Sequence, residues 1–221
     1  MITGRLTELN KDEILHYLGM NRKNLDTGME CMLDECMENV VKAAKPALVY
    51  KRLPVNCGQV EGLSLEGQDI GRILGKADEA VVFAATVGSD VDRLISRTQV
   101  TDMARAVIMD ACASAAVENI CENFESDMRL EVEMEGYFLT ERYSPGYGDL
   151  PLKSQLQIGE FLNTQRRIGM VVADNCMMNP IKSVTAIMGI TKEAVTCIIH
   201  RCESCSSKDT CKLRKARINE H

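Results

Sequence analysis

The feature that most restricts the fold is an alanine-rich stretch, residues 101–121, that is apolar on nearly every side of a helix. Such a helix has to be buried, and its small side chains let neighbouring segments approach closely. We therefore expect a central helix covered by other elements. Asp110 interrupts this stretch. Because Arg105 is poorly spaced to pair with it, we expect Asp110 to face a partner elsewhere in the fold, or a cleft.

Apolar runs elsewhere predict strands around that helix. Residues 79–86 form a continuous apolar run that ends before Gly88, which predicts a buried strand. Residues 183–190 predict a second strand of small and apolar side chains. Residues 47–60 alternate in the manner of a strand. These runs are compatible with an α+β fold.

Periodic apolar residues predict further helices. In residues 29–44 they recur at intervals of three and four, which predicts an amphipathic helix. Asp26 or Thr27 can cap its start, and Pro46 ends it. Shorter helices are predicted at residues 12–19, 68–74 and 152–162.

Two local patterns carry more specific predictions. Ser89 and Asp92 have the spacing of a capping box for a helix that follows the apolar strand. Glu131, Glu133 and Glu135 alternate with apolar residues, which predicts an extended segment with three carboxylates on one face.

Composition narrows the class of protein. The net charge is −6 and no basic block occurs, so nucleic acid and anionic membranes are not expected as partners. No run of 18 uncharged apolar residues and no signal peptide are evident in the sequence, so we expect a cytoplasmic protein. In that compartment the ten cysteines should be reduced thiols or metal ligands. Six of them are scattered and are expected to be structural: Cys31, Cys36, Cys57, Cys112, Cys121 and Cys176.

Residues 140–151, Thr-Glu-Arg-Tyr-Ser-Pro-Gly-Tyr-Gly-Asp-Leu-Pro, contain two glycines and two prolines, which exclude a regular helix. Arg142 offers a planar fork of donors that suits a carboxylate, and Tyr147 offers an apolar ring with a polar tip. Gly146 and Gly148 let the backbone approach a ligand closely. The segment is therefore either a ligand-binding loop or a plain turn with Arg142 as a surface charge.

Within this loop, the run from Arg142 to Tyr147 resembles the Arg-x-x-Pro-Gly-Tyr signature of the activation domain of cobalamin-dependent methionine synthase. A second segment, residues 177–184, reads Met-Met-Asn-Pro-Ile-Lys-Ser-Val and is similar to a stretch of that family in which a methionine and a proline precede Ser-Val. The order and spacing of the two motifs make the resemblance specific. It extends nearly end to end over the free-standing proteins related to this domain.

The resemblance implies a single domain, residues 1–195, with a twisted, largely antiparallel sheet and helices packed around it, followed by a cysteine-rich extension, residues 196–221. It also implies that the chain binds S-adenosylmethionine and supports the reductive methylation of cobalamin. No cobalamin, homocysteine or folate module fits within the chain. The cobalamin is therefore expected on a separate methionine synthase or corrinoid methyltransferase, with an electron donor such as flavodoxin. The chain would supply the reactivation step of a methyltransferase system in methionine biosynthesis.

The same resemblance implies roles for individual residues. Arg142 would bind the carboxylate of the methionine moiety, and Tyr147 would lie between the two cofactors. The long enzymes have an aromatic residue where Met188 stands. Lys182 would be functional only if its turn faces the loop. Electrostatics favours an acid near a cationic sulfonium, for which Glu135 is our choice. The candidate cofactor-binding residues are Arg142, Tyr143, Ser144, Pro145, Gly146, Tyr147, Lys182, Ser183, Met188, Gly189 and Glu135; no catalytic nucleophile or general base is expected.

Four cysteines cluster near the C-terminus, at Cys197, Cys202, Cys205 and Cys211, with four, two and five residues between them. Thiolates separated by two residues can hold one metal ion, so zinc or an iron–sulfur cluster is one interpretation. Redox-active free thiols and incidental thiols are the others. A metal-containing or redox reactivator of corrinoid proteins, which does not use S-adenosylmethionine, is therefore the alternative function.

Overall fold

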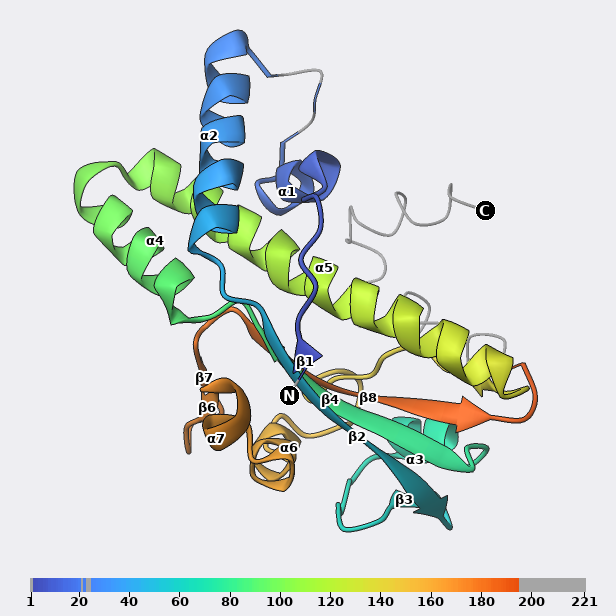
Figure 1. Ribbon diagram of the computed structural model, residues 1–221. Coiled ribbons are helices and arrows are strands. Elements are labelled where there is room, and N and C mark those ends of the chain that lie inside the picture. Colours follow the sequence, from blue (N-terminus) through green and yellow to red (C-terminus); the bar gives the residue numbers. More distant parts are fainter. Residues whose placement is uncertain (1, 21, 23–24, 195–221) are drawn as a thin grey trace.

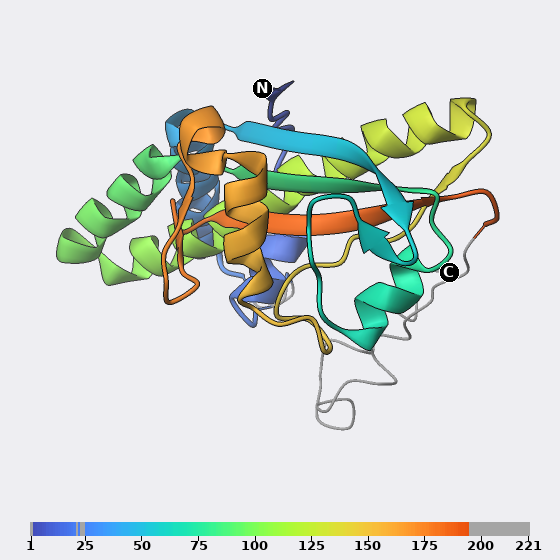
Figure 2. The ribbon, with the colours of Figure 1, turned by 90° about the horizontal axis from the view of Figure 1, so that it is seen from below.

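The computed structural model describes residues 2–20, 22 and 25–194. Its centre is an antiparallel sheet in the order β1-β2-β4-β8-β5, and β3 pairs with the end of β2. Helices pack on both faces of this sheet (Figures 1 and 2), which confirms the predicted α+β fold. The helices are α1 (Lys11–Tyr17), α2 (Thr27–Ala43), α3 (Gln68–Leu74), α4 (Ser89–Thr101), α5 (Met103–Met134), α6 (Ser154–Leu162) and α7 (Thr164–Ile168). The strands are β1 (Ile2–Thr3), β2 (Ala47–Asn56), β3 (Gln59–Val60), β4 (Glu79–Thr86), β5 (Phe138–Leu139), β6 (Val171–Val172), β7 (Met178–Asn179) and β8 (Ser183–Thr191).

Strand β4 is the middle of the sheet and is covered on both faces. All eight of its residues pair with β2 on one side and with β8 on the other. Val81 and Phe83 point into the core under α5, whereas Val82 and Ala84 point into the core that includes α3 and α6. Because both faces are covered, the strand is apolar at every position between its two ends, from Ala80 to Ala85.

Helix α5 is 32 residues long and lies across one face of the sheet (Figure 1). At about 1.5 Å per residue it measures about 48 Å. It continues well past Cys121, so the prediction of an extended segment around Glu131 and Glu133 is wrong. Met128 and Val132, four residues apart, are both buried. The buried face of α5 therefore keeps the helical spacing of apolar residues in the segment where the glutamates alternate.

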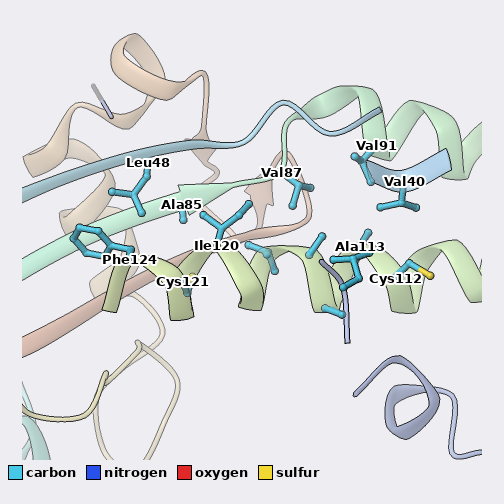
Figure 3. Close-up of a cluster of buried hydrophobic side chains, with 14 of the residues drawn as sticks. Val40, Leu48, Ala85, Val87, Val91, Cys112, Ala113, Ile120, Cys121 and Phe124 are labelled. Carbon is cyan, nitrogen blue, oxygen red and sulfur yellow. The ribbon is translucent and has the colours of Figure 1, made fainter. Parts of the chain in front are cut away.

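Phe124 on α5 points toward the sheet, among aliphatic side chains such as Leu48 and Ile120 (Figure 3). The centroid of the Phe124 ring, on α5, lies 5.0 Å from that of Phe83 and 5.1 Å from that of Tyr50. Phe83 is fully buried. The rings therefore join the long helix to the two strands β2 and β4.

Buried thiols line the same core. Cys36, Cys112 and Cys121 have no exposed surface, which confirms the structural role predicted for them. Burial raises the pKa of Cys112 and of Cys121 to about 12, so both stay protonated. Cys31 and Cys57 are exposed, so burial was the wrong prediction for these two.

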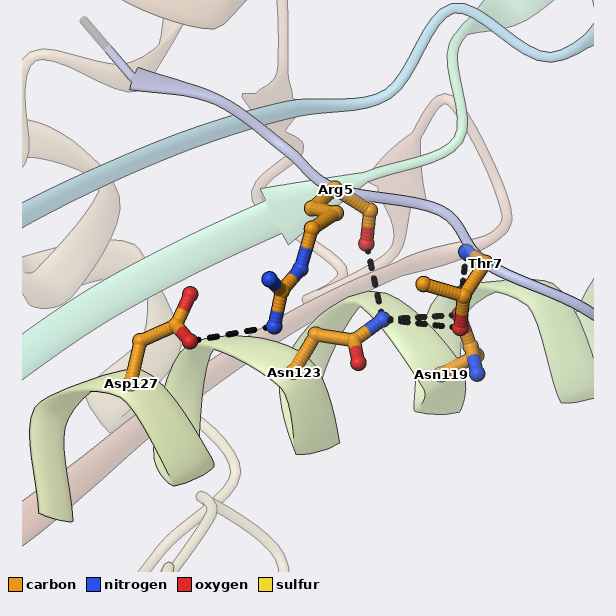
Figure 4. A network of polar contacts seen from close by, with 5 residues as sticks. All are labelled: Arg5, Thr7, Asn119, Asn123 and Asp127. Carbon is orange, nitrogen blue, oxygen red and sulfur yellow. Dashed lines mark hydrogen bonds and ion pairs between the residues drawn. The ribbon is translucent and has the colours of Figure 1, made fainter. Parts of the chain in front are cut away.

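The segment before α1 is tied to α5 by side chains (Figure 4). Asn119 accepts a hydrogen bond from the backbone N–H of Thr7 at 2.9 Å, and Asn123 donates to the carbonyl of Arg5 at 3.0 Å. The Arg5 guanidinium pairs with Asp127 at 3.0 Å. These contacts fix the N-terminal segment along the solvent side of the long helix.

The starts of two helices were predicted from capping residues, with different outcomes. Asp26 caps α2 by accepting a hydrogen bond from Met29 N at 2.8 Å, as predicted. The capping box at Ser89 is wrong, because the N-cap of α4 is Gly88, at φ +89°. The Asp92 carboxylate instead accepts a hydrogen bond from the N–H of residue 181 at 2.8 Å.

Among the described helices, none combines the length and apolarity that a membrane span requires.

Candidate functional site

The loop of residues 140–151 follows β5 and runs beside β8. Thr140 N donates to the Gly189 carbonyl at 2.9 Å, and Gly189 N donates to Thr140 Oγ1 at 2.8 Å. Tyr143 and Ile187 exchange two backbone hydrogen bonds of 2.8 and 2.9 Å. The fold thus places the Arg142 to Tyr147 motif directly against the second half of β8.

The loop turns back on itself around its glycines. Gly146 N donates to Leu150 O at 2.9 Å, and Leu150 N donates to Tyr147 O at 3.1 Å. Gly146 has φ +90°, a conformation that glycine adopts without strain. Pro145 is buried, whereas 61% of the Tyr147 side chain surface is exposed. The turn therefore presents the Tyr147 ring at the surface.

Arg142 points back toward helix α5 and is largely buried there. Its Nη2 donates to Glu118 Oε2 at 2.6 Å, and its Nε lies 3.7 Å from Glu125 Oε2. Although burial alone would lower the pKa of Arg142, the charges of Glu118 and Glu125 raise it, so the guanidinium stays charged. Arg142 is thus an oriented cation in an ion-pair network, and the interpretation as a plain surface charge is wrong.

The acidic partners of Arg142 were not predicted from the sequence. Glu118, Cys121 and Glu125 follow one another at spacings of three and four, so they lie on one face of α5. That periodicity was visible in the sequence. What the sequence could not show is that a loop from beyond the end of the helix returns to this face.

Helix α1 brings two more groups to the same region. The Tyr17 hydroxyl lies 3.1 Å from Glu13 Oε1. Burial, followed by the charges of Glu122 and Glu118, raises the pKa of Glu13, while Arg142 and the Tyr17 hydrogen bond lower it. The surroundings of Arg142 are therefore acidic on balance, which favours a ligand that carries positive charge.

The start of β8 is held against α5 by side-chain contacts. Lys182 Nζ donates to Asp110 Oδ2 and to Ser114 Oγ, each at 2.9 Å, which confirms that Asp110 has a partner elsewhere in the fold. Ser183 donates to the Pro180 carbonyl at 2.7 Å and is buried. Four residues separate Ser183 from Ile187, about 13 Å of strand. Because Glu118, the partner of Arg142, follows Ser114 by four residues, the side chains of Lys182 and Arg142 reach neighbouring turns on the same face of α5, about 6 Å apart along the helix axis.

The two candidates at the end of β8 lie on opposite faces of the sheet. The Met188 side chain is fully buried in the core under α5. Gly189 lies against Thr140, and a Cβ at this position would come within 3.1 Å of Ala77 Cβ. Gly189 therefore contributes close backbone contact with the loop, and Met188 contributes packing.

Glu135 lies at the end of α5, apart from the loop. Its carboxylate accepts hydrogen bonds from Arg52 Nη1 at 2.8 Å and Nη2 at 2.6 Å. The Arg52 contact lowers the pKa of Glu135. Of the two partners of Arg142, Glu125 is closer to Glu135 along α5. Glu135 still follows it by ten residues, or about 15 Å of helix. The structure thus does not bring Glu135 together with the arginine.

Glu135→Gln is expected to destabilise the protein at neutral pH, because the neutral amide loses the charge-assisted pair with Arg52. A carboxyl with a lowered pKa stabilises the fold above its unfolded pKa, and this stabilisation is lost as the pH falls through its folded pKa. The difference in thermal midpoint from the wild type should therefore shrink below about pH 4.

Thermal denaturation over a pH series, with Glu131→Gln as an exposed control on the same helix, measures this effect. A difference that is independent of pH would contradict the assignment of the ion pair. Titration of Glu135→Gln with S-adenosylmethionine should give the wild-type affinity. Weakened binding would show that Glu135 belongs to the binding site after all.

The four C-terminal cysteines, Cys197, Cys202, Cys205 and Cys211, lie outside the described residues. Within residues 2–20, 22 and 25–194, no group of three or more His, Cys, Asp or Glu side chains could hold a metal ion. The metal interpretation of the C-terminal cluster therefore stays a prediction.

Comparison with solved structures identifies the class of fold. The chain resembles the crystal structure of the MetH reactivation domain bound to AdoHcy, with a TM-score of 0.65 and 16% sequence identity. The match covers 95% of this chain and 84% of that chain. At this identity the likeness establishes a reactivation-domain fold.

The family follows from the sequence itself. The family model described as "Vitamin B12 dependent methionine synthase, activation domain" matches residues 70–215, more than half of the chain. This chain belongs to that family, which confirms the resemblance seen in the two motifs. No curated protein matches the chain.

Proposed function

We propose that this chain binds S-adenosylmethionine and supports the reductive methylation of cobalamin carried by a separate methionine synthase or corrinoid methyltransferase. The observation that carries the proposal is the junction between the loop and β8. Four hydrogen bonds from Thr140 and Tyr143 hold the Arg142 to Tyr147 motif against Gly189 and Ile187. The related structure whose fold this chain shares is a complex with AdoHcy, the demethylated product of this donor.

The charges near the loop suit a zwitterionic amino acid with a cationic sulfonium. Arg142 matches the ligand carboxylate, which would share the guanidinium with Glu118 or take the place of a present contact. Glu118, held 2.6 Å from Arg142, would accept a hydrogen bond from the ligand ammonium. Glu13 and Glu125 add negative charge that favours the sulfonium over a neutral thioether.

The remaining candidates have supporting roles in this proposal. Backbone groups from Tyr143 to Gly146 would meet the adenosine, and the exposed Tyr147 ring would lie between the donor and the cobalamin of the partner. The partner's reduced cobalamin supplies the nucleophile that accepts the methyl group. This chain would bind and orient the donor, an effect of proximity that can be worth several kcal/mol.

S-adenosylmethionine is expected to raise the thermal midpoint of the chain and to give a saturable calorimetric isotherm. At 100 times the Kd the gain in unfolding free energy should be about 2.7 kcal/mol. S-adenosylhomocysteine should bind more weakly, because it lacks the positive sulfur. Titrations with and without a cobalamin-loaded methyltransferase complete the test, and the absence of any shift with S-adenosylmethionine would contradict the proposal.

The same preparation addresses the redox alternative. If the cysteines outside the described residues hold iron and deliver electrons, anaerobically purified protein should contain stoichiometric iron and show a broad visible absorption band. If the protein contains iron and does not bind S-adenosylmethionine, the result would favour the alternative function, a metal-containing or redox reactivator of corrinoid proteins.

A further inference from the structure

The loop makes a second set of contacts, to helix α3, on the side away from β8. Asp149 Oδ2 accepts a hydrogen bond from Gln68 N at 2.6 Å, and Asp149 Oδ1 accepts one from Asp69 N at 3.1 Å. The N-cap position of α3 is Gly67, which has no side chain to cap these N–H groups. A carboxylate from a distant loop therefore does what a local capping residue does in most helices.

Two glycines keep the space that this contact needs. A Cβ at Gly67, where φ is +134°, would lie 2.8 Å from Asp149 Oδ1. A Cβ at Gly148 would lie 2.2 Å from the Tyr143 hydroxyl and 2.4 Å from Asp69 Oδ2. Both positions thus admit glycine alone without a shift of the loop or of α3.

Tyr143 makes the third link. Its backbone pairs with Ile187 of β8, while its buried hydroxyl lies 3.0 Å from Tyr147 O and 3.3 Å from Asp69 Oδ2. The loop is therefore held by β8 at its start and by α3 after its turn. Tyr147 lies between these two attachments, whereas Arg142 lies within the first, between Thr140 and Tyr143.

We infer that Asp149 is a positioning residue, which fixes the loop on α3 so that the turn from Ser144 to Tyr147 keeps the placement a ligand requires. The ligand part of this inference rests on the proposed function, whereas the ordering of the loop does not. The two N–H groups of Gln68 and Asp69 lower the pKa of Asp149, so its carboxylate is ionised at neutral pH and both oxygens act as acceptors.

Asp149→Asn tests the inference with little change of shape. The amide keeps one acceptor oxygen but turns an NH₂ group toward the other backbone N–H, so one hydrogen bond and the charge are lost. Affinity for S-adenosylmethionine, measured by calorimetry on the full chain, should fall about fivefold or more. Asp127→Asn, which removes a surface pair with Arg5 and no described contact with the loop, should leave the affinity unchanged.

A second measurement reports loop order without any ligand. The sequence contains no tryptophan, so Tyr147→Trp places a single tryptophan, which can be excited selectively over tyrosine, at the exposed tip of the loop. In this background Asp149→Asn should increase the fast component of the time-resolved anisotropy, and Asp127→Asn should not. Thermal midpoints show that each variant is folded at the measuring temperature.

The outcomes separate the inference about Asp149 from the proposed function. Unchanged anisotropy in Asp149→Asn would overturn the inference, and so would unchanged affinity in a chain that binds S-adenosylmethionine. If the wild type does not bind that ligand, the proposed function fails, and the anisotropy alone supports or overturns the ordering of the loop by Asp149.

Discussion

Replacing Arg142 with alanine is expected to weaken binding of S-adenosylmethionine about tenfold or more. A charge-assisted contact to a carboxylate contributes about 1.5–3 kcal/mol, and about 1.4 kcal/mol corresponds to a factor of ten. The variant also leaves Glu118 without its 2.6 Å partner, so some loss of thermal stability should accompany the loss of affinity. Calorimetric titration well below the thermal midpoint separates the two effects.

Arg105→Ala is a matched control for this experiment. Arg105 also belongs to an ion-pair network on α5, in which it donates to Glu35 at 2.6 Å. Among the described residues, no contact links Arg105 to the loop. Its removal should change stability and leave affinity as in the wild type. Equal affinities for Arg142→Ala and the wild type would remove Arg142 from the site.

Replacing Phe83 with alanine should give the largest loss of stability, about 3–5 kcal/mol. Phe83 is fully buried on the central strand, and its ring centroid lies 5.0 Å from that of Phe124 on α5. The substitution removes a large apolar side chain and leaves a cavity between β4 and the long helix. Urea denaturation measures the loss as a lower midpoint.

Val100→Ala provides the contrast, because 86% of the Val100 side chain is exposed and its removal creates no cavity. Its unfolding free energy should stay within about 0.5 kcal/mol of the wild type. A loss below about 1 kcal/mol for Phe83→Ala would mean that the interface between β4 and α5 is not the core of this fold.

Elements with an unambiguous period were predictable from the sequence. The apolar strand at residues 79–86 and the helix at residues 68–74 have the bounds that their patterns predicted. Helix α5 was predicted too short, because alternating glutamates near its end imitate a strand while the buried Met128 and Val132 keep the helical period. Local alternation was misleading here, since burial of one face decided the conformation.

The site was predictable only in part. Glycine and proline marked the loop, and the motif marked Arg142, because both are local properties of the chain. The pairing of Arg142 with Glu118 and the capping of α3 by Asp149 join residues far apart in sequence, so no local pattern could predict them. The pairing of the mostly buried Lys182 side chain with Asp110 was not predictable for the same reason.

Neighbouring residues of α5 connect two distant parts of the chain. Glu118 is bonded to the loop through Arg142, and Asn119, the next residue, is bonded to the N-terminal segment through Thr7. A single turn of α5 therefore anchors both the loop and the N-terminal segment, so a substitution that distorts this turn would disturb two distant parts of the chain at once.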